Sequence, residues 1–143
     1  MSTEDNKALV RRLYEEVFNR GNLSTVDELL AADYIDHTAL PGTSSGPEGL
    51  KQFISLFRAA FPDLHFTIED MIAAGDTVVV RQTYRGTHKG DLMGISPTGK
   101  QVTITSIDIG RFAGGKLVEH WGATDSLGLL QQLGVVPPLG QAS

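Results

Sequence analysis

The sequence predicts an α+β domain in which helices come first and an antiparallel sheet follows. Large apolar residues recur at three- and four-residue spacing up to Phe61, which is the period of an amphipathic helix. From His65 to Thr124, β-branched and aromatic residues instead alternate with polar ones between glycine-marked turns. Helices that precede the strands, rather than alternating with them, pack as a layer on one face of an antiparallel sheet.

Three helices are expected before the sheet. The first covers residues 4–20 and ends before Gly21, the second covers residues 24–30, and the third starts at the capping-box pair Ser45 and Glu48. The third helix ends before a proline and presents five large apolar residues on one face: Leu50, Phe53, Ile54, Phe57 and Phe61. That face must cover other apolar groups.

The remaining elements follow from alternation and turn residues. Residues 32–46 indicate a brief strand and a loop, strands are expected over residues 65–72, 77–85, 100–112 and 116–124, and a short helix over residues 126–133. Residues 134–143 are expected to be a flexible tail. In the strand around Ser106, neither alternating set is purely polar, which suggests that the outer face of the sheet is covered by a second copy of the chain. We therefore expect a homodimer.

Composition narrows the classes of function. A chain of 143 residues with 41% hydrophobic and 20% charged residues is typical of one globular domain, here residues 1–143. The net charge of -5 and the scattering of the basic residues argue against nucleic acid or an anionic membrane as partners. The absence of cysteine excludes disulfides and thiolate chemistry and suits the cytoplasm. No segment resembles a signal peptide or a membrane span.

Polar residues in "SIDIGRFAGGKLVEHWGATD" (106–125) are the strongest candidates for chemistry. With a three-residue turn at residues 113–115, Asp108 lies opposite His120 and Ser106 opposite Gly122; a two-residue turn instead places Asp108 opposite Trp121. We favour the three-residue turn because a type I turn with a glycine bulge is a common hairpin ending. A carboxylate beside an imidazole fixes the tautomer of the ring and raises its basicity. On spacing alone, a structural polar pair worth about 0.2–1 kcal/mol is the commoner outcome.

Other polar residues have two interpretations each. Asp36 and His37 end a short strand where they can enter a pocket mouth or only form a turn. Arg81 lies among valines, so it points into a polar cavity or pairs across an interface. Asp125 precedes a helix, where aspartate commonly serves as the N-cap, and Trp121 is more often a packing residue than a ligand platform.

Motifs for cofactor or metal binding are absent from the sequence. It contains no phosphate-binding glycine loop after a strand, no HExxH or GxSxG, and no histidines at metal-ligand spacing. We therefore expect an enzyme, if it is one, to work without a cofactor or metal by moving protons within a pocket.

Three segments resemble the SnoaL-like polyketide cyclases of the nuclear-transport-factor-2-like superfamily: "GTHKGDLMGISPTGK" (86–100), "RFAGGKLVEHW" (111–121) and "DSLGLLQQLG" (125–134). The resemblance implies a cone-shaped fold, with N-terminal helices packed on a curved antiparallel sheet around an apolar pocket, and association through the sheet face. It also implies cofactor-free ring closure by intramolecular aldol condensation, in which an aspartate removes a proton next to a carbonyl.

The family's site residues are not retained at the matching positions. The resemblance places the cyclase aspartate at Gly122, its histidine partner at Asp108, a glutamine at Ser106 and an asparagine at Asp36. All four positions differ, so either the acid/base pair has been rebuilt with its partners exchanged, or the pocket binds small apolar molecules without turnover.

We expect a polyketide-cyclase-like enzyme acting on a small, largely apolar carbonyl compound. Asp108 and His120 are the expected acid/base pair. The expected ligand-binding residues are Asp36, His37, Arg81, Ser106, Trp121 and Asp125. The alternatives are a non-catalytic binding protein, or a dehydratase, isomerase or epoxide hydrolase on the same scaffold.

Overall fold

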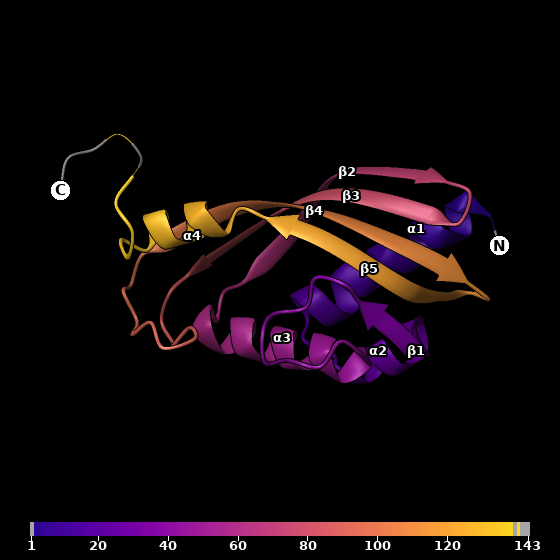
Figure 1. Cartoon of the computed structure of the whole chain (residues 1–143), viewed down its shortest axis with the longest axis horizontal. Helices are drawn as coiled ribbons and strands as arrows, with labels where there is room; N and C mark the ends of the chain where they lie inside the picture. Colours follow the sequence, from indigo (N-terminus) through magenta and orange to yellow (C-terminus); the bar gives the residue numbers. More distant parts are fainter. Residues whose placement is uncertain (1, 139, 141–143) are drawn as a thin grey trace.

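The computed structural model, which describes residues 2–138 and 140, confirms the α+β cone fold (Figure 1). Its helical segments are α1 (Thr3–Arg12), η1 (Leu13–Asn19), α2 (Ser24–Leu29), α3 (Pro47–Ala60) and α4 (Ser126–Gln132). Its strands are β1 (Leu30–Asp36), β2 (His65–Ala74), β3 (Thr77–Thr87), β4 (Gln101–Ala113) and β5 (Lys116–Thr124). Of the expected flexible tail, positions 139 and 141–143 lie outside the described residues.

The five strands form one sheet in the order β1-β5-β4-β3-β2. Strand β1 pairs with β5 in parallel, whereas the other three pairs are antiparallel. The sheet is therefore mixed, where the sequence predicted an antiparallel one. The reason is the long connection: most of the chain separates β1 from β5, so no hairpin dictates their relative direction.

The first predicted helix is not regular throughout. It begins at α1, where Ser2 and Asp5 form a capping box, and it continues as the π-helical segment η1. A wide turn of this kind inside a helix is often found at functional sites. Here it carries Tyr14, whose buried side chain reaches the sheet.

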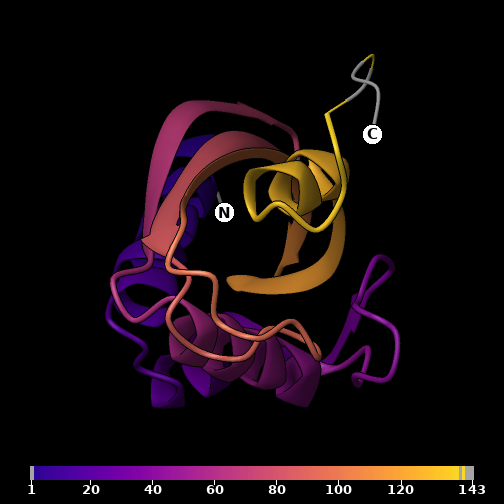
Figure 2. The same ribbon diagram turned by 90° about the vertical axis from the view of Figure 1, so that its left-hand side faces the viewer.

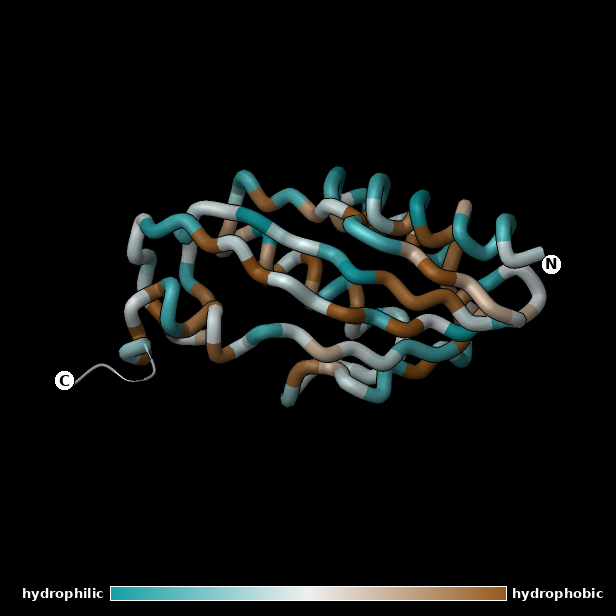
Figure 3. The backbone as a smooth tube through the Cα atoms, turned by 90° about the horizontal axis from the view of Figure 1, so that it is seen from above, coloured by the Kyte–Doolittle hydropathy of each residue, from teal (hydrophilic) through white to brown (hydrophobic). Residues whose placement is uncertain are grey.

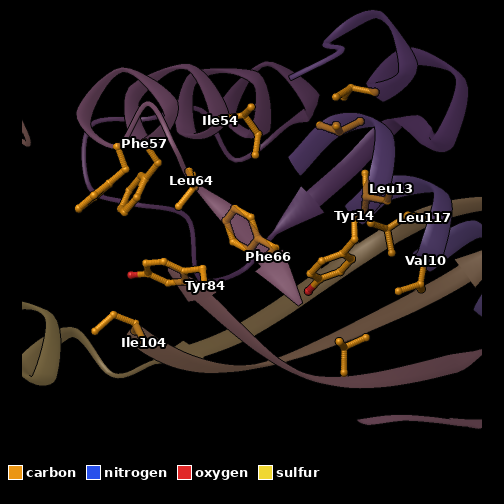
Figure 4. Packing of buried hydrophobic residues seen from close by; sticks show 14 of the residues in the cluster. Val10, Leu13, Tyr14, Ile54, Phe57, Leu64, Phe66, Tyr84, Ile104 and Leu117 are labelled. Atoms are coloured by element: carbon orange, nitrogen blue, oxygen red, sulfur yellow. The ribbon is translucent and has the colours of Figure 1, made fainter. Parts of the chain in front are cut away.

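Helices α1, α2 and α3 lie on the concave side of the curved sheet, and α4 closes one end (Figures 1 and 2). Aromatic rings pack between these layers. Figure 4 shows Phe66 between Tyr84 and Tyr14, at centroid distances of 5.4 Å and 6.3 Å. Phe57, from the apolar face predicted for the third helix, packs edge-on against Tyr84.

Hydrophobic and hydrophilic residues are interspersed along the strands (Figure 3). On the convex face this leaves large apolar side chains in contact with solvent, among them Ile107 and Trp121, which are 39% and 37% exposed. Residues that alternate with them point to the concave side, where Ser106, for example, is buried. The sheet thus has one packed face and one partly apolar open face.

The turn between β4 and β5 corrects the predicted hairpin. Ala113 pairs with Lys116, so the turn contains only Gly114 and Gly115. Both glycines have positive φ angles, 58° and 79°, as a type I′ turn requires. One residue farther along, the register shifts and leaves Val118 of β5 as an extra residue.

Because of this shift, the residues of β5 beyond Val118 point to the same face of the sheet as they would after a three-residue turn. Asp108 pairs with Gly122, and His120 pairs with Gly110. Asp108 and His120 therefore project from the same concave face, as predicted, but they lie diagonally rather than opposite each other.

Candidate active site

His120 lies between two carboxylates. Its Nε2 is 2.8 Å from Oδ1 of Asp108, and its Nδ1 is 2.9 Å from Oδ1 of Asp36. The three side chains are each largely buried, with 20–24% of their surface exposed. They form a continuous chain of hydrogen bonds, Asp36–His120–Asp108.

Three neighbouring strands hold this chain of groups. Asp36 ends β1 and pairs in register with His120 of β5, so the two side chains leave the sheet side by side. Asp108 comes from β4 on the other flank of β5. The parallel β1–β5 pairing, which the sequence did not predict, is therefore what adds Asp36 to the predicted pair.

Gly122 makes the contact between Asp108 and His120 possible. A Cβ atom at this position would lie 2.8 Å from Oδ1 of Asp108, closer than real Cβ atoms come, and 3.0 Å from Cε1 of His120, which is tighter than most Cβ contacts. The resemblance places the family's acid/base aspartate at this position. Any side chain there would displace the pair that this protein has instead.

Asp108 also accepts hydrogen bonds from three uncharged donors. Its Oδ2 receives them from the Tyr14 hydroxyl (3.2 Å), from Nε2 of Gln82 (3.2 Å) and from the Ser106 hydroxyl (3.4 Å). Sequence reasoning found Ser106 but missed Tyr14 and Gln82. Gln82 could have been found, because it is a polar residue in the inward-facing apolar set of β3. Tyr14 gave no such signal, since an aromatic residue fits an apolar helix stripe.

Charge in this cluster favours a protonated imidazole. Burial alone would lower the pKa of His120, but its hydrogen bonds to Asp108 and Asp36 and their negative charges outweigh it and raise the pKa to about 9. Burial likewise works against ionisation of Asp36, yet hydrogen bonds from His120 and Thr38 and the charge of His120 hold its pKa below the ordinary value. At neutral pH the imidazolium therefore faces an ionised Asp36.

The cluster forms part of the wall of a cavity of about 310 Å³ between the sheet and α3. This volume is at the lower end of the range for small-molecule sites. Apolar side chains dominate the lining, including Leu13, Phe18, Leu50, Phe53, Phe57, Leu117, Leu129 and Leu130. The described lining residues include no lysine or arginine, so His120 is the cation of this cavity.

Of the predicted ligand-binding residues, Asp36 and Ser106 line the cavity, whereas the other four lie elsewhere. Trp121 is on the convex face, where its ring stacks on His37 at a centroid distance of 4.8 Å. Arg81, on the same face, forms an ion pair with Asp70. Asp125 is the N-cap of α4 and accepts a hydrogen bond from the Gly128 N–H. It therefore has the capping role that was the second interpretation of this residue.

Within residues 2–138 and 140, no group of three or more acidic or histidine side chains is placed to hold a metal ion. None of the helices over the same residues is both long enough and apolar enough to cross a membrane.

Comparison with known proteins agrees with this architecture. The chain is 31% identical to nogalonic acid methyl ester cyclase of Streptomyces nogalater over 82% of its own length and 89% of the relative's. It is 30% identical to aklanonic acid methyl ester cyclase DnrD of Streptomyces peucetius over 94% and 92% of the two chains. The solved structure of TsrD from Streptomyces laurentii superimposes with a TM-score of 0.87 at 28% identity, over 95% of this chain and 99% of TsrD.

The sequence profile of the SnoaL-like polyketide cyclases matches residues 8–133, which is most of the chain. The protein therefore belongs to the SnoaL-like polyketide cyclase family.

Proposed function

We propose that the protein is a cofactor-independent cyclase that closes a ring in a small, largely apolar carbonyl compound by acid/base catalysis. The observation that carries the proposal is the Asp36–His120–Asp108 chain in the wall of an otherwise apolar cavity. It contains the predicted acid/base pair, Asp108 and His120, and adds a second carboxylate. Perturbed titratable groups that converge on a cavity are typical of catalytic sites.

The reaction that such a site supports is an intramolecular aldol condensation. A carboxylate takes a proton from the carbon next to a carbonyl, and the electron pair moves onto that carbonyl oxygen as an enolate. The enolate carbon then bonds to a second carbonyl carbon of the same molecule, whose oxygen receives a proton. The imidazolium of His120 supplies positive charge near the developing anion, and the apolar lining strengthens this effect by excluding water.

The substrate class follows from the relatives. Two of them are cyclases of nogalonic acid methyl ester and aklanonic acid methyl ester. We propose an aromatic polyketide ester of this kind as the substrate, because its flat apolar body suits an aromatic and aliphatic lining while its carbonyl groups can reach the polar wall.

The test is to incubate the protein with each of these two esters and to separate the products by chromatography with mass detection. Ring closure by an aldol reaction leaves the mass unchanged, so the expected result is a new peak of substrate mass. His120→Gln should abolish it, whereas Asp70→Asn, on the convex face, should not. Ligand-induced thermal stabilisation without any product, across a panel of aromatic polyketides, would instead favour a non-catalytic binding protein.

We further propose that the protein works as a cytoplasmic homodimer joined through the convex face of the sheet. Ile35, Ile107 and Trp121 are exposed there and would be covered by a second copy. Sedimentation velocity should give the mass of a dimer, and Ile107→Asp should shift it to a monomer. Leu127→Asp, at a similarly exposed apolar position on α4, is the matched control and should remain dimeric. A monomeric unaltered protein would exclude the proposal.

A further inference from the structure

The two carboxylates beside His120 differ in how many of their oxygens accept hydrogen bonds from the protein. Both oxygens of Asp108 are engaged: Oδ1 with His120, and Oδ2 with donors from η1, β3 and β4. A substrate would have to compete with these protein donors for either oxygen of Asp108.

Among the described residues, Asp36 accepts hydrogen bonds on one of its oxygens only. Oδ1 accepts from Nδ1 of His120 (2.9 Å), from the Thr38 backbone N–H (2.9 Å) and from the Thr38 hydroxyl (3.2 Å). Within the described part of the chain, Oδ2 has no hydrogen-bond partner. The side chain lines the cavity and is 21% exposed, so this oxygen is open to a ligand.

His120 is not free to exchange a proton with a substrate. Both ring nitrogens lie within hydrogen-bond distance of carboxylate oxygens, and a protonated imidazole donates both of its N–H groups to them. Besides supplying positive charge, it can hold Asp36 in place and keep it ionised.

We propose that Oδ2 of Asp36 is the atom that accepts the substrate proton, with His120 and Asp108 as positioning residues behind it. This rests on the proposed acid/base function and assigns its base. In the step, the substrate C–H bond breaks, the proton goes to Oδ2, and the electron pair moves to the carbonyl oxygen. After the new carbon–carbon bond forms, the carboxylic acid returns the proton to the oxygen of the attacked carbonyl.

Tyr34 is placed to stabilise the enolate. It lies two residues before Asp36 on β1, lines the same cavity and is buried, and its hydroxyl makes no hydrogen bond to the described part of the chain. Burial and the negative charges of Asp36 and Asp108 raise its pKa far above the ordinary value. It therefore remains a neutral O–H donor that can point at a developing oxyanion.

Removal of a proton from carbon can be tested without the natural substrate. The probe is 5-nitrobenzisoxazole, a small apolar molecule. A base removes its ring C–H proton, the N–O bond breaks, and a coloured cyanonitrophenolate forms in one step. Asp36→Asn should lower kcat/KM on the order of 10²-fold or more, the usual contribution of a general base. Asp108→Asn should lower it less than about tenfold, and Asp33→Asn, exposed on the same strand, should leave it unchanged.

The pH profile of the unaltered protein is a second test that needs no variant to fold. The charged and titratable groups that face Asp36 are His120 from β5, Asp108 from β4, Tyr34 from its own strand and, beyond Asp108, Tyr14 from η1. Because the pKa of Asp36 is lowered, kcat/KM should be level from pH 6 to 8. A rate that rises with pH toward 9 would make neutral His120 the base and overturn the proposal.

The remaining outcomes separate this assignment from the proposed function. The assignment of Asp36 as the base would be overturned if Asp108→Asn lowered kcat/KM for the probe more than Asp36→Asn does. It would also be overturned if the unaltered protein converted the probe no faster than Asp36→Asn does. Elimination of the probe without cyclisation of the two esters would keep Asp36 as the base and reject the substrate class. Cyclisation that survives Asp36→Asn would keep the function and reject the base.

Discussion

Two histidines on opposite faces of the sheet each contact a carboxylate at the same distance, but their surroundings differ. Nε2 of His120 is 2.8 Å from a carboxylate oxygen of Asp108, and Nε2 of His37 is 2.8 Å from one of Glu119. His120 lies on the concave face with 24% of its side chain exposed; His37 lies on the convex face with 39% exposed, stacked on Trp121.

The difference lies in what else surrounds each pair. Glu119 is already paired with Arg111, a permanent cation, so its charge is balanced whether or not His37 is protonated. Asp36 and Asp108 have no such cation in the described cavity lining, and only a proton on His120 can balance them. Attraction between charges also strengthens as water is excluded. Contact distance alone therefore does not identify a functional histidine; the charge balance of its enclosure does.

The largest expected effect is on the pH dependence of stability. The pKa of His120 is raised from 6.5 to about 9 in the folded protein. A raised pKa contributes stability that is fully present below pH 6.5 and is lost as the pH rises through 9. We expect the free energy of unfolding, from urea titrations, to fall by up to about 3 kcal/mol between these pH values.

A variant of His120 tests whether this residue causes the slope. His120→Gln should flatten the curve between pH 6.5 and 9. A slope that survives in His120→Gln would show that the concave cluster does not hold the proton.

The next largest effect is expected from crowding the concave pair. In Gly122→Ala, the added Cβ would overlap Oδ1 of Asp108 and force it away from His120. We expect the free energy of unfolding to fall by about 1–3 kcal/mol. The pKa of His120, measured by NMR of the imidazole protons, should fall below about 9. Gly110→Ala, on the same face, crowds Leu117 instead. It should destabilise comparably and leave the pKa of His120 unchanged; equal pKa values in both variants would refute the role of Gly122.

The hairpin also shows how far the sequence could predict the site. Alternation correctly placed Asp108 and His120 on one face, but the turn was predicted one residue too long, and an extra residue at Val118 compensated. A bulge depends on how the strands twist and pack, and periodicity carries no signal for it. The face predicted for Asp108 and His120 was therefore right, although the turn length from which it was predicted was wrong.

Long-range pairing accounts for most of what the sequence missed. The helices and strands were predictable because their periods are local properties of the chain. The parallel β1–β5 pairing brings Asp36 to His120 across 84 residues of sequence, and η1 brings Tyr14 to Asp108 across 94. Such contacts are set by tertiary packing. Conversely, His37, Trp121 and Asp125 were candidates by residue type, and only their placement shows them outside the cavity lining.

A smaller effect is expected from removing one donor to Asp108. Tyr14→Phe deletes the hydroxyl that lies 3.2 Å from Oδ2, which should cost about 0.5–1.5 kcal/mol. It should not lower the pKa of His120, because a carboxylate with fewer donors attracts the imidazolium more strongly. Tyr34→Phe is the matched control: it removes a buried hydroxyl that has no partner in the described chain, so unfolding should change by only a few tenths of a kcal/mol.

The smallest effect is expected on the convex face, in His37→Ala. The variant loses a partly exposed hydrogen bond to Glu119 and a stacking contact, but Arg111 still neutralises Glu119. Exposed polar pairs contribute about 0.2–1 kcal/mol. We therefore expect a loss below about 1 kcal/mol. Both histidines have a carboxylate oxygen 2.8 Å from Nε2. If His37→Ala lost as much stability as Gly122→Ala, this contact would determine the stability at both sites, and the second carboxylate and the burial around His120 would add little.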